Sequence, residues 1–305
     1  MSIAFLFPGQ GAQKTGMGRS FYEEEPLSRE VFLNASKLLS LDMEELVFSE
    51  NDKLNITEYT QAALVCTCIA MLKAVEKRGI KAEVCAGLSL GEYAALYYSG
   101  AMSEEDALRV VRERGKLMQE AVRGEGAMAA VLGLSAEETQ EAIKGIEGVW
   151  IANYNCPAQI VISGYAEAVE KASEELKKAG AKRVIALNVS GPFHSPLLKE
   201  AGEALYRYLS DFEISDPKLP YVANYHGDYV YSAKGIRELL RDQVSGAVRF
   251  EQSIRKMIAE GVDTFIEIGP GKTLSAFVKK IDQNVRILNI ENTEDIERVA
   301  QALSV

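Results

Sequence analysis

The stretch Glu83-Val84-Cys85-Ala86-Gly87-Leu88-Ser89-Leu90-Gly91-Glu92-Tyr93 decides the fold. Its apolar first half predicts a buried strand that ends at Leu88, and residues 92–98 predict a helix directly after the turn at Ser89. A G-x-S-x-G run between a strand and a helix makes a sharp elbow, which lifts the serine hydroxyl above the edge of a sheet. Glycines leave room for this strained turn. The stretch therefore predicts an α/β fold with Ser89 on such an elbow.

Other parts of the chain predict the partners of this strand. Further strands are expected at residues 3–7, 221–224, 264–268 and 285–290, with amphipathic helices between them. Strands that alternate with helices are typical of a largely parallel sheet. We therefore expect one large domain built on such a sheet.

A different order of elements appears between residues 127 and 189. The expected elements are a strand at 127–132, a helix at 136–146, strands at 150–153 and 159–163, a helix at 166–179 and a strand at 183–189. The order β-α-β-β-α-β is the ferredoxin-like pattern. We therefore expect a small ferredoxin-like domain over residues 126–192, inserted into a large domain made of residues 1–125 and 193–305.

Composition narrows the class of protein. The chain has 305 residues, enough for a large domain plus a small one, and its formal net charge of -10 argues against sequence-independent binding of nucleic acid. Four cysteines without a C-x-x-C pair predict neither a zinc site nor a disulfide framework. The longest strongly apolar stretch, residues 62–72, is too short to cross a bilayer. We therefore expect a cytoplasmic protein that binds no metal, nucleic acid or membrane.

Ser89 is the candidate nucleophile. The helix that follows it offers the backbone N–H of Leu90 at the position where a tetrahedral oxyanion would form. A serine nucleophile needs a base, and the chain has two histidines, His194 and His226. His194 is favoured because it lies where the inserted segment returns to the large domain, whereas His226 lies in a predicted turn. Either histidine could instead be an ordinary surface residue.

Arg114 has an unusual place on its predicted helix. The helix begins after Ser103, and at about 100° per residue Arg114 falls near the middle of an apolar arc. A guanidinium buried there must find an anion or extend its charged end to solvent. Two interpretations are open: a structural ion pair with an Asp or Glu, or a clamp for a substrate carboxylate.

Two glycine loops match nucleotide-binding motifs only in part. The third glycine of a dinucleotide-binding loop that begins at Gly9 would fall at Lys14, and the leading glycine of a phosphate loop before Lys272 would fall at Ile266. Both loops are better explained as turns that bring backbone N–H groups to a cleft. The sequence therefore predicts no nucleotide cofactor.

Four ordered motifs carry a resemblance that spans essentially the whole chain. They are Phe7-Pro8-Gly9-Gln10-Gly11-Ala12-Gln13, Gly87-Leu88-Ser89-Leu90-Gly91-Glu92-Tyr93, Gly191-Pro192-Phe193-His194-Ser195 and Glu267-Ile268-Gly269-Pro270-Gly271-Lys272-Thr273. Together they resemble the malonyl-CoA:acyl carrier protein transacylase family. The resemblance implies an α/β-hydrolase-like large domain with a ferredoxin-like insert, in agreement with the order of elements above.

The resemblance also implies roles for individual residues. Ser89 would be the nucleophile and His194 its base, with the backbone N–H groups of Gln10 and Leu90 as the oxyanion hole and Arg114 as the clamp for the malonyl carboxylate. The position of Gln243 would supply a main-chain carbonyl that orients the histidine. The site would then be a Ser-His dyad, and the side chain of Gln243 should matter little.

The implied activity is ping-pong transfer of a malonyl group from malonyl-CoA to the phosphopantetheine thiol of acyl carrier protein, for fatty acid biosynthesis. The CoA thioester would be a substrate, no cofactor would be tightly bound, and the protein would be a monomer. Polyketide synthesis stays open as the pathway. One departure concerns Leu88, since most members of the family have histidine immediately before the nucleophile. It leaves the elbow intact but removes a polar group near the site.

Two other functions stay open at this point. A serine hydrolase with the same elbow would place an acid and then a histidine after the serine, and would recruit Asp211 and His226. A docking module for carrier protein could keep the fold without catalysis.

Overall fold

A six-stranded sheet forms the centre of the computed structural model, which describes residues 1–121, 126–189 and 191–303. Its strands are β1 (Ile3–Phe7), β2 (Val84–Gly87), β7 (Tyr221–Ala223), β8 (Asp228–Val230), β9 (Thr264–Ile268) and β10 (Arg286–Ile290). They follow the order β10-β9-β1-β2-β7-β8, and every neighbouring pair is parallel except β7 with β8. The predicted parallel sheet is therefore confirmed. The short β8 was not predicted, because residues 224–228 indicated only a turn.

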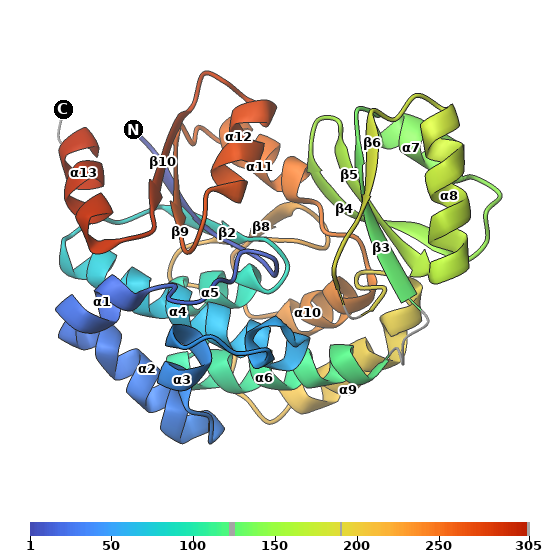
Figure 1. Cartoon of the computed structure of the whole chain (residues 1–305). Helices are drawn as coiled ribbons and strands as arrows, with labels where there is room; N and C mark the ends of the chain where they lie inside the picture. The colour runs from blue at the N-terminus through green and yellow to red at the C-terminus, as the bar shows by residue number, and fades with distance from the viewer. Residues whose placement is uncertain (122–125, 190, 304–305) are drawn as a thin grey trace.

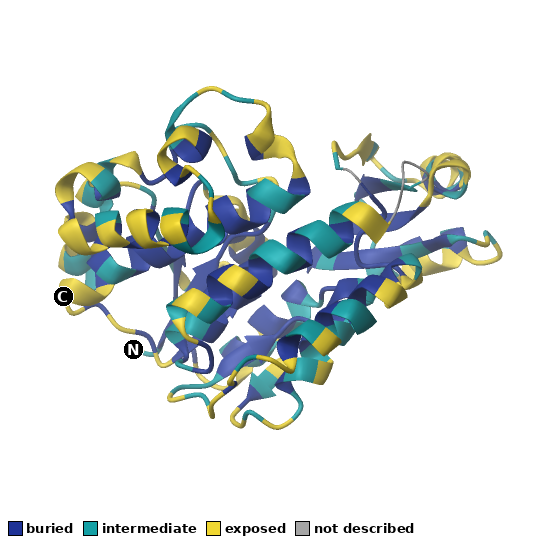
Figure 2. Ribbon diagram, turned by 90° about the horizontal axis from the view of Figure 1, so that it is seen from below, coloured by how far each residue is buried: buried dark blue, intermediate teal, exposed yellow. Residues whose placement is uncertain are grey.

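Helices cover both faces of this sheet (Figure 1). They are α1 (Arg19–Glu24), α2 (Pro26–Leu39), α3 (Met43–Phe48), α4 (Thr57–Lys77), α5 (Gly91–Tyr98), α6 (Glu104–Ala121), α9 (Lys199–Leu209), α10 (Ile236–Ser245), α11 (Phe250–Ala259), α12 (Thr273–Ile281) and α13 (Thr293–Leu303), with single 3-10 turns at Lys53–Asn55 and Pro196–Leu198. Figure 2 shows that buried residues lie between the layers and exposed residues on the outer faces of the helices.

The alternation of side chains along β1 explains the layers. Phe5 and Phe7 pack into the larger hydrophobic cluster with α4 and α6, whereas Ala4 and Leu6 point to the opposite face, where α11 and α12 cover them. Successive side chains of a strand point to opposite faces, so a strand covered on both faces is apolar throughout. All five residues of β1 are buried, as that arrangement requires.

A second, four-stranded sheet lies beside the first (Figure 1). It consists of β3 (Gly126–Leu132), β4 (Val149–Cys156), β5 (Gln159–Tyr165) and β6 (Arg183–Ala186), with α7 (Ala136–Ile143) and α8 (Ala166–Lys178). Its order β4-β5-β3-β6 is antiparallel throughout and is that of a ferredoxin-like fold. The predicted fold class is confirmed, although the helix predicted to run to residue 146 ends at Ile143, just before Gly145 takes a positive φ of 87°.

The parallel register brings two loops together at one edge of the large sheet. Phe7 at the end of β1 lies opposite Gly87 at the end of β2. Carboxyl ends of parallel strands meet at the same edge, which is where α/β proteins place their sites. The loop after β1, with Gln10, therefore lies beside the turn after β2, with Ser89.

No helix in the described part of the chain is both long enough and apolar enough to span a bilayer. The apolar stretch at residues 62–72 belongs to α4, which is buried along most of its length. Its apolar character therefore serves the core of the protein.

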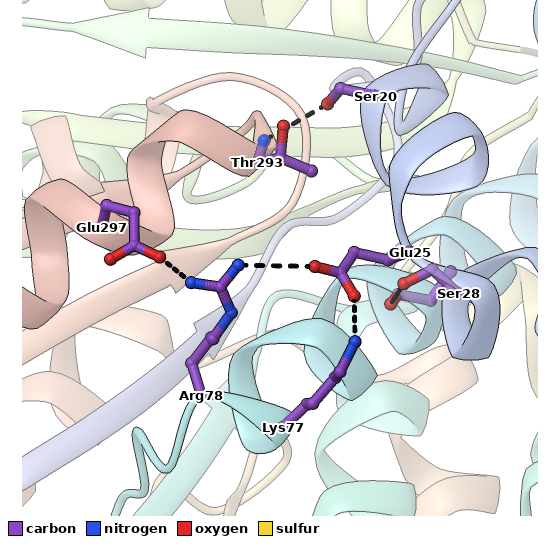
Figure 3. Close-up of polar contacts among 8 residues, drawn as sticks. Ser20, Glu25, Ser28, Lys77, Arg78, Thr293 and Glu297 are labelled. Carbon is purple, nitrogen blue, oxygen red and sulfur yellow. Dashed lines mark hydrogen bonds and ion pairs between the residues drawn. The ribbon is translucent and has the colours of Figure 1, made fainter.

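An ion-pair network ties α13 to the amino-terminal helices (Figure 3). Glu25 accepts from Lys77 at 2.7 Å and lies 3.7 Å from Arg78, which also pairs with Glu297 of α13. Nearby, the backbone N–H of Thr293 donates to the Ser20 hydroxyl at 3.3 Å. The side chain of Glu25 is only 9% exposed, whereas that of Glu297 is 59% exposed.

The two carboxylates of this network should contribute unequally to stability. We expect Glu25→Ala to lower the free energy of unfolding by about 1 to 3 kcal/mol, since it leaves two cations beside a nearly buried position. Glu297→Ala should cost less than about 1 kcal/mol, because exposed pairs contribute little. Urea denaturation of both variants measures the difference, and equal losses would contradict this account.

Candidate active site

Ser89 occupies the strained elbow that its motif predicts. Its φ is +53°, a left-handed conformation that residues other than glycine rarely adopt. A Cβ on Gly87 would lie 2.0 Å from the backbone carbon of Gly91, and one on Gly91 would lie 2.2 Å from the carbonyl oxygen of Phe7. Both glycines are therefore required by close backbone approach, and the turn holds Ser89 at the carboxyl end of β2.

Asn224 holds the elbow from the neighbouring strand. Its side chain is fully buried, accepts from the backbone N–H of Ser89 at 2.6 Å and donates to the carbonyl of Gly87 at 2.6 Å. Sequence reasoning did not single out this residue. A signal existed, because Asn224 directly follows β7, and β7 pairs in parallel with β2.

His194 makes a direct hydrogen bond with Ser89. Its Nε2 lies 2.7 Å from the Ser89 Oγ, and its Nδ1 lies 2.7 Å from the main-chain carbonyl oxygen of Gln243. A carbonyl oxygen can only accept, so Nδ1 carries the proton and Nε2 is free to accept from the serine hydroxyl. This tautomer suits a general base. Among the described residues, Ser89, His194 and Gln243 thus form the arrangement that the sequence predicted.

The environment of His194 favours its neutral form. The ring is 4% exposed and has a φ of +58°, so its loop is strained as well. Burial, followed by the nearby positive charge of Arg114, lowers the pKa of His194 to about 4. A base with that pKa is unprotonated throughout the physiological range.

The two predicted oxyanion donors lie at the same sheet edge. Leu90 precedes the first turn of α5, and Gln10 follows β1 in the adjoining loop, where its side chain donates to Thr57 at 3.1 Å. Within the residues that the structure describes, the backbone N–H groups of Gln10 and Leu90 make no hydrogen bond. Free N–H groups beside a serine nucleophile are suited to an oxyanion.

Arg114 reaches the serine from α6. It is 1% exposed, as the apolar arc predicted, and its guanidinium donates to Ser89 Oγ at 3.1 Å, to Gln61 at 2.7 Å and to the side chain of Gln243 at 2.9 Å. No ion pair among the described residues includes it, which removes the alternative of a structural pair in direct contact. A buried guanidinium with only neutral partners is suited to receive an anion.

The side chain of Gln243 contradicts one expectation. It is fully buried, accepts from Arg114, and donates to the Ser89 carbonyl at 2.9 Å and to Glu92 at 2.7 Å. The inference that this side chain should matter little is therefore wrong, because its removal would leave several buried polar groups without partners. Sequence reasoning considered only its main chain and did not identify Gln61 or Glu92.

The alternative triad is not assembled. His226 is exposed in the turn between β7 and β8, where its Nδ1 accepts from the backbone N–H of Asp228 at 3.0 Å, and Asp211 is exposed. Leu88 is half-buried and packs against the cluster beneath α11 and α12. No group of His, Cys, Asp and Glu side chains suited to a metal ion occurs within residues 1–121, 126–189 and 191–303.

A serine on a strand-to-helix elbow, a histidine hydrogen-bonded to it and free N–H groups beside it define a protein that moves or cleaves acyl groups. A family model described as acyl transferase domain matches residues 4–300. The chain is 47% identical over 307 residues to malonyl CoA-acyl carrier protein transacylase of Bacillus subtilis, which covers 99% of this chain and 97% of the relative. The chain therefore belongs to the malonyl CoA-acyl carrier protein transacylase family.

Solved structures agree with this assignment. The crystal structure of malonyl CoA-acyl carrier protein transacylase from Clostridium perfringens superimposes with a TM-score of 0.96 at 47% identity, over 100% of this chain and 98% of that chain. A malonyl transacylase in complex with a type II polyketide synthase acyl carrier protein superimposes with a TM-score of 0.96 at 36% identity, over 99% and 100% of the two chains. The predicted family is confirmed.

The low pKa of His194 predicts an unusual pH profile for the reactivity of Ser89. We expect the rate of Ser89 modification by phenylmethylsulfonyl fluoride at pH 5.5 to keep about 80% or more of its value at pH 7.5, because His194 with a pKa of about 4 is still neutral there. Intact mass against time measures the rate. A histidine with an ordinary pKa would lose about tenfold over this range, and such a loss would contradict the buried neutral base. His194→Ala is the control and should react slowly at both pH values.

Proposed function

We propose that this protein transfers a malonyl group from malonyl-CoA to the phosphopantetheine thiol of an acyl carrier protein, through a malonyl ester on Ser89. The observation that carries the proposal is the buried guanidinium of Arg114, which donates to the Oγ of Ser89 and has no direct anionic partner among the described residues. An acyl group on that oxygen would place its far carboxylate near the guanidinium. The malonyl group is the acyl group that meets this condition.

The first half of the reaction forms the ester. His194 takes the hydroxyl proton as the Ser89 oxygen attacks the thioester carbon, and the oxyanion is held by the N–H groups of Gln10 and Leu90. The C–O bond to serine is then complete, the C–S bond breaks, and the CoA sulfur leaves with the proton from His194. The hydrogen bond of 2.7 Å between the two side chains supports this transfer.

The second half reverses these steps with another thiol. His194 takes the proton of the phosphopantetheine thiol as its sulfur attacks the ester carbon, and the proton returns to the oxygen of Ser89 as the C–O bond breaks. The exchange needs no energy source, because one thioester replaces another. Water must be kept from the ester, and the buried surroundings of His194 favour this.

Several finer points belong to the same proposal. We propose that residues 126–192 form a small domain inserted into a large one of residues 1–125 and 193–305, and the separate four-stranded sheet supports this division. The boundary at residue 125 and the end at residue 305 lie outside the described residues. The monomeric state, the cytoplasmic location, the absence of a tightly bound cofactor and the supply of fatty acid rather than polyketide synthesis stay predictions.

Intact mass measurement tests the function directly. Incubation with malonyl-CoA should add one malonyl group to the wild-type protein, and holo acyl carrier protein should remove it. His194→Ala should abolish the adduct, while His226→Ala should keep it, since His226 is exposed and away from Ser89. A protein that forms no adduct would be a docking module, and one that only releases malonate would be a hydrolase.

Arg114 should determine which acyl group is accepted. We expect Arg114→Ala to lower kcat/KM for malonyl-CoA by a factor of about 10⁴ and the rate with acetyl-CoA much less, because a site built to pair a charged group rejects analogues that lack it. Single-turnover acylation with both donors measures this difference. Equal losses would indicate that Arg114 only supports the fold, and circular dichroism of the variant checks that the fold is kept.

A further inference from the structure

Glu92 is a carboxylate enclosed beneath the nucleophile, in the first turn of α5. It is 0% exposed, and its Oε2 accepts from the side-chain Nε2 of Gln243 at 2.7 Å and from the backbone N–H of Asn224 at 3.2 Å. Its Oε1 is buried and makes no hydrogen bond with the described residues. An ionised carboxylate in such a place is costly unless a cation compensates it. The acyl-transfer steps above do not use this group.

A single amide joins Glu92 to Arg114. The Nε2 of Gln243 donates to Glu92, while its Oε1 accepts from the guanidinium of Arg114 at 2.9 Å. The donor end of the amide thus faces the anion and its acceptor end faces the cation, so both charges polarise the amide in the same sense. Neither Glu92 nor Arg114 belongs to a direct ion pair within the described residues. The two buried charges are therefore paired through Gln243.

We propose that Glu92 determines acyl specificity, because it supplies the counter-charge of Arg114 through the Gln243 amide and so moderates the attraction of Arg114 for the carboxylate of the acyl group. The proposal rests on the proposed function, since it concerns the malonyl carboxylate at the same site. Glu92 acts through Gln243 and does not touch the substrate, so it is a positioning residue. A neutral group at this position would leave the full charge of Arg114 to the malonyl carboxylate.

The protonation state of Glu92 should have the same effect. Burial raises the pKa of Glu92 to about 7, against the opposing hydrogen bonds from Gln243 and Asn224 and the opposing charge of Arg114. Below that pKa the carboxyl is neutral, and above it the negative charge is present. A malonyl carboxylate stays ionised over this whole range, because ordinary carboxyl groups have a pKa of about 4.

The other titratable groups around Glu92 keep their charge between pH 6 and pH 8. Burial raises the pKa of Tyr93 on the same helix, of Tyr221 on β7 and of Cys85 on β2, so these groups stay neutral. Arg114 on α6 stays positive, since a guanidinium does not deprotonate in this range. His194 is neutral here as well, because its pKa is about 4. Within the described residues, Glu92 is thus the group behind Arg114 that titrates in this window.

The test compares two donors that differ in one carboxylate. Single-turnover acylation of Ser89 is measured with malonyl-CoA and acetyl-CoA for the wild type and Glu92→Gln, and the ratio of the two kcat/KM values is taken. The glutamine can still accept from Gln243 and Asn224 but carries no charge. We expect the malonyl to acetyl ratio at pH 8 to rise at least about fivefold through a lower KM for malonyl-CoA, because one like charge near the malonyl carboxylate is gone.

A merely structural role would change both donors alike. The CoA portion, Ser89 and His194 are common to the two reactions, so general damage to the site cancels in the ratio. Glu267→Gln is the matched control, since Glu267 is also a buried carboxylate, 1% exposed, but binds only the N–H groups at the start of α12. Its ratio should stay at the wild-type value. A rise as large as that of Glu92→Gln would overturn the proposal.

The wild type alone provides a second measurement, which decides the matter if Glu92→Gln does not fold. Its malonyl to acetyl ratio should be about threefold higher at pH 6 than at pH 8, because Glu92 with a pKa of about 7 is mostly neutral at the lower pH. A ratio that does not change with pH would overturn the proposal. A wild type that forms no malonyl adduct at all would instead overturn the proposed function, so the two failures are distinguishable.

Discussion

The side chain of Gln243 is the contact on which the arrangement of the site depends. Its main-chain carbonyl sets the tautomer of His194, and its amide contacts Arg114, Glu92 and the carbonyl of Ser89. One residue of α10 therefore fixes the base, the cation and the nucleophile relative to one another. Because α10 comes from a part of the chain far from both α5 and α6, the site exists only when these helices pack together.

Strain at the site is matched by support around it. Ser89 and His194 both have left-handed backbone conformations, each of which costs on the order of 1–3 kcal/mol. Asn224 offsets part of this cost with two hydrogen bonds to the elbow, and Gly87 and Gly91 remove the clashes that a Cβ would cause. The hydroxyl of the nucleophile is thus held toward its base before any substrate arrives, which reduces the reorganisation that the reaction requires.

Charge is distributed within the core in a way that suits an anionic substrate. Arg114 and Glu92 are both buried, yet they meet only through an amide, so neither is neutralised by direct contact. The positive charge also lowers the pKa of His194 and keeps the base neutral. A direct ion pair would have satisfied the arginine and left nothing to recognise a carboxylate.

The sequence by itself determined what depends on local pattern. Apolar periodicity predicted both sheets, the two glycines around Ser89 predicted the elbow, and the helical arc of residues 104–121 predicted the burial of Arg114. Only the tertiary structure decided which histidine meets Ser89, that Glu92 and Asn224 lie beside it, and that the Gln243 side chain joins them. Those contacts link residues 105 to 154 positions apart. No local pattern specifies such pairings, since they follow from the parallel register of β1, β2 and β7 and from the packing of α10 against α5 and α6.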